Sequence, residues 1–97
     1  MNQKDLTQSI LEITTKHNAE SKRTVTISKK FPYERKGELF YFMSWNSDKE
    51  SKGIEDTTNQ IDIQYNIKQE KGRVNRNYNL KIDEILLELQ RTLENIN

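Results

Sequence analysis

The chain has 97 residues, of which 32% are hydrophobic and 32% are charged, so we expect one domain with a modest core and a large solvated surface. Sixteen Lys and Arg residues against fifteen Asp and Glu residues leave a formal net charge of +1. This balance argues against a uniformly basic coat for nucleic acid but leaves room for a local basic patch. The chain contains no cysteine, which excludes disulfides, thiol nucleophiles and Cys-based metal sites.

The composition and the N-terminus suggest a cytoplasmic protein. The first residues lack the basic region and apolar stretch of a signal peptide, and no apolar run approaches the roughly 20 residues that cross a bilayer. We therefore expect no membrane partner. The chain is rich in Lys, Asn and Ile and has one Ala (Ala19) and one Pro (Pro32), a bias typical of an AT-rich bacterial, phage or plasmid gene.

The first predicted element is a helix over residues 4–18. Its apolar residues recur at helical spacing: Leu6, Ile10, Leu11, Ile13 and, at the end of the same stripe, His17. A polar connector over residues 18–22 follows.

Alternating apolar and polar residues then predict four strands. Their ranges are 23–31, 38–46, 60–68 and 73–80. The second strand is apolar on both sides, whereas the third alternates most clearly. The polar segment between them, 47–58, predicts either a loop or a continued ribbon.

Three turns are predicted at Lys-Gly pairs, over residues 34–37, 50–53 and 69–72. Glycine takes positive φ without steric cost, which suits a tight turn. Folding the chain about these turns places Phe31 opposite Phe40, Phe42 opposite Ile61, and Ile63 opposite Tyr78. Directly opposed residues share a face of the sheet. The predicted core face consists of Val25, Ile27, Phe31, Phe40, Phe42, Ile61, Ile63, Tyr65, Ile67, Val74, Tyr78 and Leu80.

The last predicted element is a helix over residues 83–96, with Asp83 as its cap and an apolar stripe at three-and-four spacing. The element order α-β-β-β-β-α predicts an α+β fold over residues 1–97. It is a four-stranded antiparallel meander, in strand order 1-2-3-4, flanked by an N-terminal and a C-terminal helix.

The sequence predicts no enzyme, metal or cofactor site. His17 is the only histidine, and no serine or threonine has a signature that ties it to His17. Residues 48–53 match a calcium loop at three positions. The match fails at the fifth position, where Lys52 has no side-chain oxygen, and at the twelfth, where Asn59 replaces the bidentate Glu. With one histidine and no cysteine, a zinc ion would have to be held mainly by carboxylates. The three glycines all fall in predicted turns, so they form no phosphate-binding loop.

A candidate binding surface lies on the face opposite the predicted core. Its large residues are Leu39, Tyr41, Met43 and Trp45, with Lys30 and Arg73 beside them. Aromatic rings on a sheet stack on bases at roughly 1–3 kcal/mol each, while basic side chains hold phosphates. Aromatic residues and Met are also enriched at protein–protein contacts.

Three interpretations of this surface stay open. The N-terminal helix covers it as a second small core, it binds a protein or a second copy of the chain, or it binds nucleic acid. We expect a small non-enzymatic binding module with a protein partner, in a regulatory, inhibitory or accessory role of the kind that phages and mobile elements encode. A homodimer and a nucleic-acid-binding module are the alternatives.

Overall fold

The computed structural model describes residues 3–46 and 58–96. The elements within these residues are α1 (Gln3–Glu20), β1 (Thr26–Ile27), β2 (Tyr33–Arg35), β3 (Glu38–Asn46), β4 (Thr58–Asn66), β5 (Lys71–Val74), β6 (Asn77–Leu80) and α2 (Ile82–Glu94). The strands form one antiparallel sheet in the order β1-β3-β4-β5-β6, and β2 pairs with the same edge of β3 as β1 does. The predicted α+β class is confirmed, but the predicted count of four strands is wrong because the described residues form six.

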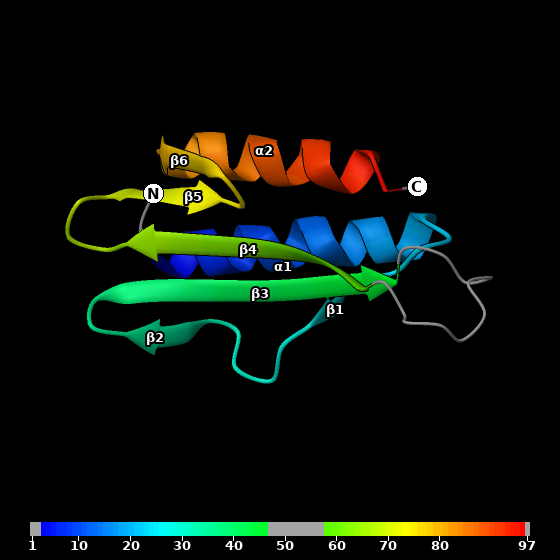
Figure 1. Cartoon of the computed structure of the whole chain (residues 1–97), viewed down its shortest axis with the longest axis horizontal. Coiled ribbons are helices and arrows are strands. Elements are labelled where there is room, and N and C mark those ends of the chain that lie inside the picture. The colour runs from blue at the N-terminus through cyan, green and yellow to red at the C-terminus, as the bar shows by residue number, and fades with distance from the viewer. Residues whose placement is uncertain (1–2, 47–57, 97) are drawn as a thin grey trace.

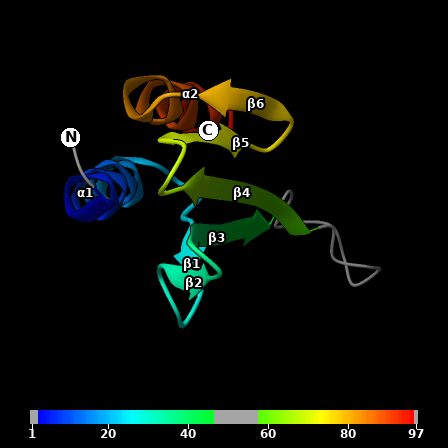
Figure 2. The ribbon, with the colours of Figure 1, turned by 90° about the vertical axis from the view of Figure 1, so that its left-hand side faces the viewer.

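Both helices lie side by side on one face of the sheet (Figures 1 and 2). The opposite face, which points away from both helices, is called the outer face below. The core is one cluster between the helices and the covered face: Leu6, Ile10, Val25, Leu39, Tyr41, Met43, Ile61, Ile63, Tyr65, Val74, Ile82, Ile85, Leu89 and Leu93. Within residues 3–46 and 58–96, neither helix is long and apolar enough to cross a membrane.

Helix α2 begins one residue earlier than predicted, and its cap is not Asp83. Lys81 precedes the helix in an extended conformation, and its backbone N–H donates to the Glu84 carboxylate at 2.8 Å. This contact satisfies a backbone donor at the helix start. Ile85 and Leu89 then point into the core from the predicted apolar stripe.

The register of β3 against β4 differs by one residue from the prediction. Tyr41 pairs with Ile63 and Met43 pairs with Ile61, whereas the sequence predicted Phe42 opposite Ile61. Because side chains alternate along a strand, this shift exchanges the two faces of β3. Phe42 therefore lies on the outer face and is 37% exposed. The predicted register depended on the turn at 50–53, which lies outside the described residues, as does segment 47–57.

The first predicted strand, 23–31, is mostly not a strand. Only Thr26–Ile27 pairs with β3, and the chain then passes a cis peptide bond between Phe31 and Pro32 before it pairs again as β2. The turn before β3 occupies only residues 36–37 of the predicted 34–37, with Gly37 at a φ of 79°. It places Tyr33 opposite Phe40, where the sequence predicted Phe31. Ile27 belonged to the predicted core face but is exposed in the structure.

The last predicted strand, 73–80, is a hairpin of β5 and β6. Asn75 turns the chain at a φ of 53°, a left-handed conformation that Asn tolerates better than most residues. The turn between β4 and β5 consequently lies at residues 67–70, and Gly72 sits within β5. A Cβ atom on Gly72 would collide with the Gln64 carbonyl oxygen of β4, so this strand pairing needs glycine. Tyr78, predicted in the core, is 66% exposed.

The variants Met43→Ala and Phe42→Ala distinguish the observed register from the predicted one. Met43 is 2% exposed, so its truncation is expected to lower the free energy of unfolding by about 2–5 kcal/mol. Phe42→Ala removes a partly solvated side chain, and a loss of about 1 kcal/mol is expected. Urea denaturation followed by circular dichroism measures both values. A larger loss for Phe42→Ala than for Met43→Ala would contradict the observed register.

Candidate functional site

The structure buries the surface that the sequence singled out. Leu39, Tyr41 and Met43 are almost completely inaccessible beneath the helices, and Trp45 packs against the same core while only partly buried. These side chains therefore form no exposed contact surface in this structure, and the first of the three interpretations describes them best. The covering layer includes both helices and not α1 alone.

Tyr41 anchors helix α1 to strand β3. Its hydroxyl group hydrogen-bonds the Thr7 hydroxyl at 2.7 Å, and the Phe31 ring meets its ring edge-on at a centroid distance of 5.2 Å. About two helical turns further along α1, the Thr14 hydroxyl donates to the Met43 sulfur at 3.7 Å. Burial raises the pKa of Tyr41 above its usual 10.0, and the hydrogen bond with Thr7 opposes part of this shift.

The outer face carries three aromatic rings in a row, from Tyr33, Phe40 and Phe42, which we call the aromatic column. Tyr33 and Phe40 face each other across β2 and β3 with centroids 5.9 Å apart. Phe40 and Phe42 stack along β3, with centroids 5.7 Å apart and planes inclined by 29°. Tyr33 and Phe42 are 36% and 37% exposed. The Lys30 ammonium nitrogen lies 5.7 Å from the centroid of the Tyr33 ring, close enough for a cation–π contact.

Polar side chains continue the outer face beyond the aromatic column. On β4 the register aligns Asp62 with Phe42 and Gln64 with Phe40. On β5, Arg73 pairs with Gln64, and its Nε–H donates to the Gln64 side-chain oxygen at 2.9 Å. The Arg73 Nη1 also donates to the Asn75 carbonyl oxygen at 3.0 Å. A hollow of about 180 Å³ lies at this end of the face, with Lys71, Arg73 and Tyr78 among its lining residues.

The small net charge of the chain conceals a separation between its two layers. The helical segments, 3–20 and 82–94, contain seven acidic and three basic residues. The sheet and its described connections, 21–46 and 58–81, contain eleven basic and four acidic residues. The helical layer is therefore acidic and the sheet layer basic. Counting charges for each predicted element would have revealed this asymmetry from the sequence.

The structure separates the predicted site residues instead of gathering them. Lys30 is exposed beside Tyr33, and Arg73 is partly buried on the outer face, whereas the apolar members lie in the core. Phe40 and Phe42 had been predicted for the core and Tyr33 for no site at all. The double apolar pattern of β3 allows either assignment, so periodicity alone could not have identified the aromatic column.

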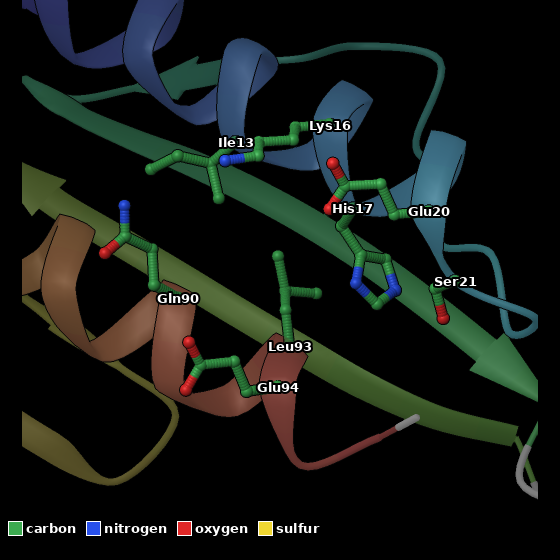
Figure 3. A pocket seen from close by; sticks show the side chains of 8 residues that line it. All are labelled: Ile13, Lys16, His17, Glu20, Ser21, Gln90, Leu93 and Glu94. Carbon is green, nitrogen blue, oxygen red and sulfur yellow. The ribbon is translucent and has the colours of Figure 1, made fainter.

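A groove of about 330 Å³ lies between the C-terminal parts of α1 and α2 (Figure 3). His17 lines it, and the imidazole Nε2–H donates to the Arg23 carbonyl oxygen at 2.9 Å. The neighbouring Asn18 side chain makes two hydrogen bonds with the backbone of Val25. Both residues thus hold the connection that follows α1. In the described part of the chain, no three or more His, Asp or Glu side chains are grouped as metal ligands.

Comparisons of the chain with protein-family models, curated protein sequences and solved structures found no match. The chemistry of the outer face is therefore the basis on which a function can be inferred.

Tyr41 is expected to make the stability of the fold depend on alkaline pH. Because the folded state raises the pKa of this phenol, its contribution to stability is complete below about pH 10 and declines as the pH rises further. Tyr41→Phe should weaken this decline, at a cost of about 1 kcal/mol at neutral pH for the lost hydrogen bond. Urea denaturation at several pH values between about 8 and 11 measures both effects.

Thr7→Val is the matched control for this experiment, because it removes the same hydrogen bond but keeps the buried phenol. It should therefore retain the alkaline decline. Burial also raises the pKa of Tyr65, so some decline should persist in Tyr41→Phe. An identical pH profile in the wild type and Tyr41→Phe would refute the assignment to Tyr41.

Proposed function

We propose that the protein is a non-enzymatic module that binds single-stranded nucleic acid through the outer face of its sheet. The observation that carries this proposal is the exposed aromatic column on the basic layer of the protein. Sequence-tolerant binding of single strands requires two features: aromatic rings on which bases stack, and a positively charged surface that holds the phosphates.

The aromatic column supports the stacking part of the proposal. Unpaired bases expose their ring faces, whereas a duplex buries them between neighbouring base pairs, so a sheet of rings favours single strands. Each base that stacks on Tyr33, Phe40 or Phe42 would contribute roughly 1–3 kcal/mol. The rings already contact each other in the free protein, so little side-chain order has to be gained on binding.

The basic residues support the phosphate part of the proposal. Lys30 lies at the Tyr33 end of the aromatic column, and Lys71 and Arg73 lie across β4 from it. Two strand spacings, roughly 9–10 Å, separate β3 from β5, so bases over β3 leave room for a sugar–phosphate backbone toward β5. The acidic helical layer would repel a strand that approached from the opposite side.

A protein partner, or a second copy of the chain, is the second candidate. Ile27 is 39% exposed on the edge strand β1, and such an aliphatic side chain at the edge of the sheet adds apolar area that suits a protein surface. The two candidates differ in their response to salt. Bound phosphates release counterions, so affinity for nucleic acid falls steeply as salt increases.

Phe42→Ala is expected to weaken the binding of a labelled mixed-sequence oligonucleotide about tenfold, because one stacking ring is lost. Fluorescence anisotropy at low salt measures the affinity, and DNA and RNA versions of the oligonucleotide show whether the sugar matters. Leu87→Ala is the control: it also truncates an exposed apolar residue, 49% accessible, but on the outside of α2. Equal affinities for both variants, or no binding by the wild type, would exclude the proposed function.

Lys71→Ala is expected to reduce the salt dependence of binding. Removal of one phosphate contact should decrease the slope of log affinity against log salt concentration by about 1. Lys16→Ala removes the same charge from an exposed position on α1, in the groove between the helices, and should leave the slope unchanged. The measurement is an anisotropy titration over a range of salt concentrations. If both variants changed the slope equally, the outer face would not be where phosphates bind, and a concentration-dependent mass would then favour self-association.

A further inference from the structure

Within residues 3–46 and 58–96, Asp62 is the acidic side chain aligned with the aromatic column at its Phe42 end. The two residues are directly opposed across β3 and β4, so their Cβ atoms lie about 4.5–5.5 Å apart on the outer face. Both line a hollow of about 510 Å³, whose other polar lining residues include Thr26, Ser28 and Gln60. A base stacked on Phe42 would thus present its edge to the Asp62 carboxylate.

Two hydrogen bonds hold the backbone of Asp62 in place. The Asp62 N–H donates to the Asn75 side-chain oxygen at 3.0 Å, and the Asn75 N–H donates to the Asp62 carbonyl oxygen at 2.8 Å. Among residues 3–46 and 58–96, no group donates a hydrogen bond or forms an ion pair with the carboxylate. A carboxylate with both oxygens available as acceptors, on a backbone that is held in place, therefore stands beside an exposed ring.

We infer that Asp62 makes the outer face selective for guanine, an inference that depends on the proposed binding of single strands. Guanine alone presents two adjacent N–H donors on its Watson–Crick edge, at N1 and at the N2 amino group, and a carboxylate accepts both. Adenine and cytosine present one amino group beside a ring nitrogen that repels the carboxylate. Thymine and uracil present one N–H group between two carbonyl oxygens.

The position of Asp62 along the sheet is compatible with phosphate binding elsewhere on the face. Arg73 pairs with Gln64 and Lys71 with Asn66, so these two basic residues lie near the Phe40 end of the aromatic column. Asp62 stands at the Phe42 end. The carboxylate repels phosphate locally and so favours the approach of a base edge, while the basic residues hold the backbone at the other end.

The test measures anisotropy with thymine oligonucleotides that carry one central guanine, hypoxanthine, adenine or cytosine. The guanine oligonucleotide is expected to bind wild type about tenfold more tightly than the adenine and cytosine ones. Hypoxanthine, which lacks the N2 amino group, should fall between them. Asp62→Asn is expected to bring the four affinities within about twofold of one another and to tighten binding of the all-thymine strand, because a negative charge is removed.

Glu38→Gln is the matched control, because it removes an acidic charge from the same face at a distance from Phe42. It should tighten binding of every oligonucleotide and keep the preference for guanine. Equal binding of all bases by wild type, or a guanine preference that survives in Asp62→Asn, would overturn the inference and leave the proposed function standing. An absence of binding to every oligonucleotide would overturn both. Unchanged urea midpoints would show that the variants are folded.

Discussion

The packing of both helices on one face of the sheet is the constraint on which the rest of the structure depends. Tyr41 lies at the centre of this contact, where its ring is fully buried and its hydroxyl group reaches Thr7 of α1. On α2, Ile85 and Leu89 pack against the same face of the sheet. Since two helices cover one face, the alternate residues of β3 are directed away from them, and an aromatic column is left at the surface.

This arrangement separates the residues that stabilise the fold from those available for binding. The core uses the odd-numbered positions of β3 and β4, and the outer face uses the even-numbered ones. Substitutions on the outer face are therefore expected to have little effect on the core. Charge follows the same division, because the acidic residues gather on the helices and the basic residues on the sheet and its connections.

Hydrogen bonds of asparagine side chains shape the ends of the sheet. Asn75 turns β5 into β6 and at the same time fastens the backbone of Asp62, while Asn18 fastens the chain before β1. These residues resemble ordinary polar loop positions in the sequence. Asparagine adopts a left-handed conformation less readily than glycine, so a turn at Asn75 was not predicted, and a hairpin was interpreted as one strand.

The sequence by itself determined the α+β class, the two terminal helices and the stripe of α2 that faces the core, because helical and strand periodicities are properties of the local chain. It also determined that β3 would be a strand. It could not determine which side of β3 is buried, since both sides are apolar and alternation then gives the same pattern for either register. Only the tertiary structure decided that Tyr41 and Met43 face the helices while Phe40 and Phe42 face outward. The physical reason is that β3 takes its register from strand and helix partners distant in the chain, and a shift of one residue exchanges core and surface.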